Sequence, residues 1–194
     1  GSGDEEAVLD LAMQPSGNLV SFGYSRGAAG CDIDPGAGVM NVNFGAGSVG
    51  GCYLSFFNPA PLTPVFLNPS PIGWDDLGVR RFAVSPADGS IAVCGYNNGV
   101  DLDPTGGVFN PGGTNDPFAV RLTAAGGYIN AVSYNTSGVQ DSDDITLDLT
   151  GNVYWIGTYG GVLDFDAGAG SDTHTSVSTS DSFVTRTRPD LTWD

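Results

Sequence analysis

One pattern occurs three times along the chain, and this repeat constrains the fold more than any single residue does. Its copies span residues 11–24, 82–96 and 145–159, and each is followed by an Asp-x-Asp element. Every copy holds an apolar run, a turn rich in Gly, Asn and Asp, and a second apolar run that carries a glycine. Each copy is therefore expected to be one structural unit that buries a face against the next unit.

The composition favours strands joined by tight turns over helices. The chain has 30 Gly and 12 Pro, and nearly all of its acidic residues are Asp, which prefers turns and caps. The predicted strands are 8–13, 19–24, 51–57 and 64–67 in the first copy, 79–84, 90–96, 117–122 and 128–134 in the second, and 145–149, 153–159 and 182–187 in the third. A fourth strand of the third copy is expected to begin at residues 191–194.

Each second strand carries a glycine at a matching place, which is Gly23, Gly95 or Gly157. A glycine inside a strand usually marks a bulge or a close approach of another backbone, so we expect one of these at each position. The third strands of the second and third copies alternate apolar and polar residues and place Arg121 and Arg186 at the same step.

These units fit the blades of a β-propeller, in which each blade is a small antiparallel sheet. We expect an all-β fold: a β-propeller-like array of three antiparallel blades, open or completed by association with other chains. The single array spans 1–194, with one blade at 8–75 that includes a proline-rich connector. The other blades are 79–139 and 144–194, the last lacking its fourth strand. Propellers usually close with about four to eight blades, so an array of three is expected to associate, to belong to a longer array, or to close unusually. Association would give a ring or a fibre.

The third copy also resembles a known family. Its segments 148–157 (DLTGNVYWIG), 163–168 (LDFDAG) and 180–186 (SDSFVTR) are similar to the bacterial β-propeller repeat of the seven-bladed type. The second copy matches with 115–121 (NDPFAVR), whereas the first departs at 51–55 (GCYLS), which lacks the acidic and the basic residue. The resemblance implies a propeller fold and an extracytoplasmic setting, without a defined activity.

The charge of the chain is strongly one-sided. There are 22 acidic and 6 basic residues, all of the latter Arg, for a formal net charge of −16. Such a charge disfavours nucleic acid and anionic membrane surfaces as partners and is compatible with divalent cations. No run of about 18 apolar residues occurs, so no membrane insertion is expected.

The Asp-x-Asp pairs are the candidate metal ligands. Residues i and i+2 of an extended segment point to the same side, so each pair sets two carboxylates side by side. Calcium prefers such oxygen ligands. The alternative is that the carboxylates accept hydrogen bonds from backbone N–H groups of their own loop. The six residues are Asp32, Asp34, Asp101, Asp103, Asp164 and Asp166.

The chain has three cysteines. Cys31 and Cys52 flank one loop of the first copy and are the candidates for a disulfide, which would indicate an oxidising compartment. Cys94 lies inside an apolar run and is predicted to be a buried thiol.

No catalytic constellation is apparent from the residues. His174 is the one histidine and lies in a loop rich in Ser and Thr, where a solvated side chain is expected. The acidic pairs recur in every copy, which favours an architectural role over an active site. Tyr24, Tyr96 and Tyr159 recur at matching positions and are expected to pack between blades, although aromatic side chains can also bind sugars.

These observations favour a non-enzymatic protein with no certain cofactor, calcium being the candidate. We expect a secreted, extracellular or cell-surface structural protein that assembles with itself into a ring or filament. The alternative is an adhesin-like module that binds a glycan or a surface protein.

Overall fold

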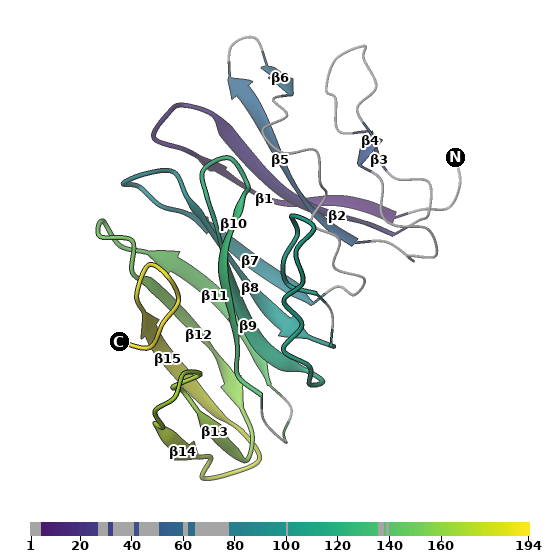
Figure 1. The fold of residues 1–194 in the computed structure, drawn as a ribbon. Coiled ribbons are helices and arrows are strands. Elements are labelled where there is room, and N and C mark those ends of the chain that lie inside the picture. The colour runs from purple at the N-terminus through teal and green to yellow at the C-terminus, as the bar shows by residue number, and fades with distance from the viewer. Residues whose placement is uncertain are drawn as a thin grey trace.

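The computed structural model describes residues 5–26, 31–32, 41–42, 51–59, 62–64, 78–99, 101–135, 138 and 140–194. Within these residues the protein is all-β, with three main antiparallel sheets and two short two-stranded ones (Figure 1). The described part contains no helix that is long and apolar enough to cross a membrane.

Each main sheet is built from consecutive principal strands of one repeat copy. The first sheet has the order β1 (Glu5–Met13), β2 (Leu19–Arg26), β5 (Gly51–Pro59), β6 (Leu62–Pro64). The second has the order β10 (Tyr128–Ser133), β9 (Asp116–Leu122), β8 (Ile91–Asn97), β7 (Val79–Val84). The third has the order β11 (Asp141–Leu147), β12 (Val153–Tyr159), β15 (Asp181–Thr187). The predicted antiparallel sheets are therefore confirmed.

Two short hairpins were not expected from the sequence. They are β3 (Cys31–Asp32) with β4 (Asn41–Val42), and β13 (Val162–Asp164) with β14 (Thr173–Thr175). Among the main strands, 79–84 and 153–159 are as predicted, and most others differ by one or two residues. The first strand of the third copy was predicted at 145–149 but runs Asp141–Leu147, because the chain has already turned at Asp148. Of the predicted strand 64–67, β6 includes only Pro64, and 65–67 lie outside the described residues.

The three strand glycines mark one recurrent β-bulge, as predicted. Gly23, Gly95 and Gly157 each pair with a first-strand residue that is followed by one extra, unpaired residue, after which regular pairing resumes. An extra residue on one strand bends it and increases its twist. The bulge therefore sets the same local bend in all three sheets.

An aromatic side chain of the third strand lies opposite each of these glycines. The pairs are Gly23 with Tyr53, Gly95 with Phe118, and Gly157 with Phe183. A Cβ at Gly157 would lie 2.8 Å from ring atoms of Phe183, and one at Gly23 would lie 2.7 Å from the Tyr53 ring. A real Cβ does not tolerate such distances, so the ring occupies the space that glycine leaves open.

The sheets pack face to face in sequence order, with the second sheet between the other two (Figure 1). In each sheet one face carries the third-strand aromatic, which is Tyr53, Phe118 or Phe183. We name this face the rear face and the opposite one the forward face. The forward face of the first sheet, with Val20 and Phe22, packs on the rear face of the second. The forward face of the second packs on the rear face of the third by the same rule.

Two apolar clusters fill these interfaces. The first combines Val20, Phe22 and Phe56 of the first sheet with side chains of the second, including Phe82, Ile91, Val93, Phe118 and Val120. The second combines Ala92, Cys94 and Ala119 of the second sheet with side chains of the third, including Ile145, Leu147, Val153, Trp155 and Phe183. The apolar core of the described residues thus lies mainly between sheets.

Polar contacts also join neighbouring sheets. The buried Gln14 amide donates to the carbonyl oxygens of Gly89 and Ala124, both at 2.8 Å, and so links the first sheet to two turns of the second. Arg80 of β7 pairs with Asp141 of β11 at 2.7 Å. These polar contacts therefore fix the orientation of neighbouring sheets, in addition to the apolar packing between them.

The chain begins a fourth strand of the third sheet where the sequence predicts it. Trp193 forms a bridge with Thr187, just as Tyr128 pairs with Leu122 at the start of β10. The preceding turn is also the same, because Leu191 has a φ of 63°, the region that Gly126 adopts at 82°.

The glycine–aromatic contact predicts the effect of one substitution. Gly157→Ala is expected to lower the free energy of unfolding by about 1–3 kcal/mol, since the added methyl group would overlap Phe183 and the Asp141 carbonyl. Chemical denaturation measures this change. Thr158→Ala, one residue further along β12, is the control and should change stability much less. Equal stability of Gly157→Ala and the unmodified chain would contradict the account.

Candidate functional site

The Asp-x-Asp loops of the second and third copies have the same hydrogen bonds. Oδ1 of Asp101 accepts the backbone N–H groups two and eight residues later, at 3.0 and 2.7 Å. Oδ1 of Asp164 accepts the groups at the same two positions, at 3.0 and 2.8 Å. One carboxylate oxygen therefore closes each loop at two points.

The second aspartate of each pair closes a smaller turn. Oδ1 of Asp103 accepts from the N–H and the hydroxyl of Thr105, at 2.8 and 2.6 Å. Oδ1 of Asp166 accepts the Gly168 N–H at 2.8 Å. Short polar side chains commonly make this contact with the backbone two residues on.

A glycine four residues after the second aspartate completes the loop, and the sequence prediction did not include it. A Cβ at Gly107 or Gly170 would overlap Oδ2 of Asp103 or Asp166, respectively. The signal was present in the sequence as a recurrent glycine, which in the first copy is Gly38. Gly38 lies outside the described residues.

The residue between the two aspartates points into the core. Leu102 is fully buried in the first apolar cluster, and Phe165 is buried in the second. The loops therefore have a structural effect, because their hydrogen bonds hold an apolar side chain between two sheets.

The structure supports loop closure as one role of four of the six predicted metal ligands. Among the described residues, no group of three or more His, Cys, Asp or Glu side chains is placed to hold a metal ion. Asp32 is exposed at the end of β3, and Asp34 lies outside the described residues. Calcium binding by these loops stays a prediction from the sequence.

Loop closure and calcium binding differ in what they predict. Asp101→Ala is expected to lower the free energy of unfolding by about 0.5–2 kcal/mol, because two backbone N–H groups lose their acceptor. Asp101→Asn keeps one acceptor oxygen and should cost less. If closure by hydrogen bonds is the whole role, the melting temperature is the same in calcium and in EGTA. A rise with calcium that Asp101→Asn abolishes would show that the loop binds the metal.

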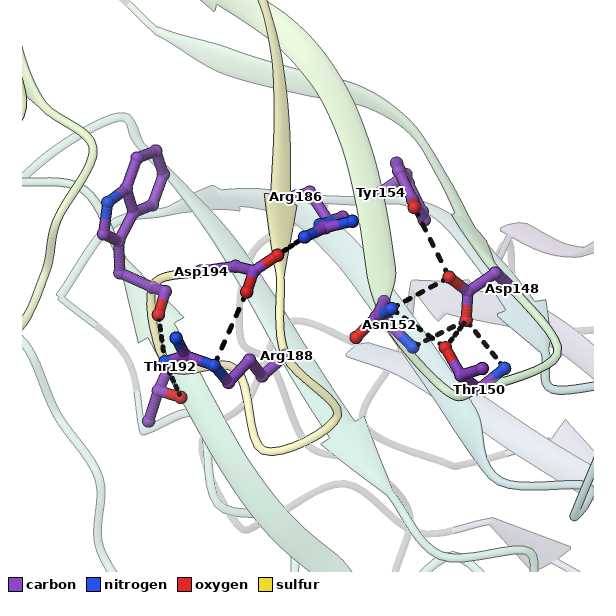
Figure 2. A network of polar contacts seen from close by, with 9 residues as sticks. Asp148, Thr150, Asn152, Tyr154, Arg186, Arg188, Thr192 and Asp194 are labelled. Carbon is purple, nitrogen blue, oxygen red and sulfur yellow. Dashed lines mark hydrogen bonds and ion pairs between the residues drawn. The ribbon is translucent and has the colours of Figure 1, made fainter.

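The turn between β11 and β12 is held by another aspartate (Figure 2). Oδ1 of Asp148 accepts from the N–H and hydroxyl of Thr150, at 2.8 and 2.7 Å, and from the Asn152 N–H at 3.0 Å. Oδ2 accepts from the Asn152 amide at 2.9 Å and the Tyr154 hydroxyl at 3.3 Å. These contacts, the Thr150 hydroxyl first, hold the pKa of Asp148 below its usual range.

Asp88 lies in the turn between β7 and β8, directly before the turn glycine Gly89. The hydroxyl of Ser90 donates to its carboxylate, as does the Ser90 N–H at 3.1 Å. These hydrogen bonds, the hydroxyl first, lower the pKa of Asp88 to about 2. The aspartates of the turns are therefore stabilised as anions.

This stabilisation predicts a pH dependence. An aspartate in an unfolded chain has a pKa of about 3.9, so the lower folded pKa of Asp88 adds stability above about pH 4. That contribution is lost as the pH falls from about 4 through about 2. Urea denaturation across this range is expected to show a steep loss of stability, which Asp88→Asn makes shallower. Asp143→Asn removes an exposed charge on β11 and is the control; an equally shallow curve for both variants would contradict the role of Asp88.

The structure places two of the three cysteine side chains. Cys94 is fully buried between the second and third sheets, where burial raises the pKa of its thiol, so the predicted buried thiol is confirmed. Cys52 is buried on the forward face of the first sheet. The side chain of Cys31 lies outside the described residues, and the Cys31–Cys52 bridge stays a prediction.

The predicted equivalence of the three tyrosines is wrong for Tyr159. Tyr24 and Tyr96 directly follow the strand glycine, whereas Tyr159 lies two residues after Gly157 and pairs with Asp181. Successive residues of a strand point to opposite faces, so Tyr159 lies on the rear face and packs in the second cluster. Tyr24 packs at the edge of the first cluster from the forward face.

The side chain of His174 is exposed, as predicted, but it lies in the short strand β14 and not in a loop. Its Nε2 lies 3.2 Å from Oδ1 of Asp172, which precedes that strand. Asp181 caps the adjoining loop by accepting the Val177 N–H at 2.8 Å. These contacts are local and structural.

A groove of about 500 Å³ lies between β10 and the loop that follows β13, with Phe109 and Trp193 among its lining side chains. Two of its polar side chains are already engaged. Asn130 donates to the Asp190 carbonyl at 2.7 Å, and Asp166 accepts from its own loop. Other side chains that line the groove have no hydrogen-bond partner among the described residues, namely the hydroxyls of Ser133 and Thr187. Glycan or protein binding stays an alternative predicted from the sequence.

The rear face of the first sheet differs from its counterparts in exposure. By strand register, Leu11 corresponds to Phe82 and Ile145, and Met13 corresponds to Leu147. Phe82 and Ile145 are both 5% exposed, whereas Leu11 is 58% exposed. Met13 is 65% exposed and Leu147 only 7%. The first-strand part of this apolar surface is thus covered in two sheets and open in one, whereas Tyr53, on the same face of the first sheet, is buried.

No protein-family model matches the chain, and neither does any curated protein. The described residues thus combine closed loops and packed faces with exposed apolar side chains on the first and third sheets.

Proposed function

We propose that the chain is a non-enzymatic structural module whose three sheets are β-propeller-type blades and which assembles with further copies of itself. The observation that carries this proposal is the exposure of Leu11 and Met13, at positions where the other two sheets bury apolar side chains. Apolar surface of this kind gains free energy when it is covered, by about 25 cal/mol per Å² removed from water.

The blade assignment is supported by three features. Each sheet is an antiparallel meander, each carries the same bulge and glycine–aromatic pair, and neighbouring sheets stack with forward face on rear face. The first strands of successive sheets also contact one another, β1 with β7 and β7 with β11. Stacked units of this kind bury a continuous core only when each has a neighbour.

A structural role is favoured over catalysis by what the acidic side chains do. Asp101, Asp103, Asp164 and Asp166 accept hydrogen bonds from their own loops, and their arrangement repeats from one copy to the next. The net charge of −16 and the family resemblance support an extracellular or cell-surface setting. Calcium stabilisation remains part of the proposal to be tested through the loops.

Self-association can be tested with two variants of similar chemistry. Light scattering of the unmodified chain is expected to show a mass that rises with concentration. Leu11→Ser combined with Met13→Ser should shift the chain toward monomer, because the open apolar face becomes polar. Val108→Ser replaces an equally exposed apolar residue in a loop of the second sheet and is the control. A stable monomer of the unmodified chain at all concentrations would contradict the proposal.

A further inference from the structure

We infer that the copies associate head to tail, with the forward face of the third sheet of one copy on the rear face of the first sheet of the next. This inference rests on the proposed self-association and adds its geometry. The occupant of the open face is thus a second copy of this chain, presented in one orientation.

The two internal interfaces provide the precedent. In both, the forward face contributes the residues next to the strand glycine of its second strand, Phe22 in one case and Cys94 in the other. In both, the rear face of the following sheet contributes its first strand, β7 or β11, and the aromatic of its third strand. The chain therefore packs forward on rear twice, and forward on forward or rear on rear never occurs among the described sheets.

This rule leaves one rear face and one forward face without a neighbour. The rear face without a neighbouring sheet is that of the first sheet, where Leu11 and Met13 of β1 are exposed and Tyr53 of β5 is buried. The open forward face is that of the third sheet, where Ile156 is 42% exposed and Val184 is 77% exposed. By register, Ile156 corresponds to Cys94 and Val184 to Ala119, both fully buried in the internal interface.

A close approach of an arginine to a turn glycine at the internal interface also has its counterparts on the outer faces. Arg121 lies on the forward face of the second sheet, and its Nη2 is 3.7 Å from the position of a Cβ at Gly151, in a turn of the third sheet. The residue that corresponds to Arg121 is Arg186, which is half exposed and pairs with Asp194 (Figure 2). The residue that corresponds to Gly151 is Gly17, where a Cβ would meet no atom within 4 Å.

Which faces of two copies meet decides the form of the assembly. A contact between the forward face of one copy and the rear face of the next is heterologous, and it repeats without limit unless the rotation closes a ring. A contact between the rear faces of two copies is isologous, and it stops at a dimer. The internal precedent supports the heterologous contact, in which the third sheet of one copy packs on the first sheet of another.

The net charge gives the association a characteristic salt dependence. Copies that each carry −16 repel one another, and salt reduces this repulsion because the screening length falls from about 10 Å at 0.1 M to about 3 Å at 1 M. An interface formed by Leu11, Met13, Ile156 and Val184 depends little on attraction between charges. Association is therefore expected to increase with sodium chloride.

Thiol cross-linking separates the two orientations. Leu11→Cys and Ile156→Cys chains are mixed and treated with a short bismaleimide, after light scattering shows that each variant still associates. The head-to-tail contact predicts a cross-linked dimer in the mixture and little in either variant alone. The unmodified chain measures the background from Cys31, Cys52 and Cys94, and Val108→Cys mixed with Ile156→Cys is the matched control.

The outcomes distinguish this inference from the proposed function. Cross-linking of Leu11→Cys with itself, or association without any cross-link in the mixture, would overturn the head-to-tail geometry and leave self-association standing. Absence of association by light scattering in both low and high salt would overturn both. A ladder of products from the chain that carries both cysteines would support a continuous head-to-tail array.

Discussion

In each of the three sheets an aromatic residue of the third strand pairs with a glycine of the second, and the rest of the sheet depends on that position. At Gly23 and Gly157 the glycine gives the ring its space, and in all three sheets the residue opposite the glycine on the first strand begins a bulge. Because side chains alternate along a strand, this one fixed position decides which residues point forward and which point to the rear. The identity of the two faces, and thus the stacking of sheets, follows from it.

The acidic loops contribute to the same architecture in a different way. Their carboxylates accept backbone N–H groups and keep Leu102 and Phe165 between neighbouring sheets. A chain with a net charge of −16 thereby uses part of its charge to close loops, while the interfaces between sheets remain largely apolar. This separation explains how so acidic a chain presents an apolar surface such as Leu11 and Met13.

Much of this arrangement was accessible from the sequence, because it occurs in three copies. The repeated glycines predicted the bulges, and the copies predicted the principal strands. What the sequence did not show was the consequence of small shifts: Tyr159 follows its glycine by two residues, which places it on the opposite face from Tyr24. Nor did it show exposure, since Leu11 and Ile145 are the same kind of residue at the same step, and only the neighbouring sheet makes one of them buried. The loop glycines Gly107 and Gly170 were visible as a pattern, but their reason, a carboxylate oxygen in the place of a Cβ, required the folded loop.

The central claim is that the chain extends its own stacking rule to other copies. Electron microscopy of the unmodified chain in high salt tests this claim most directly, because it shows the assembly itself. The account predicts polar stacks or closed rings in which every sheet follows the previous one in the same sense. Two-fold symmetric dimers, or isolated single copies at every concentration, would contradict it.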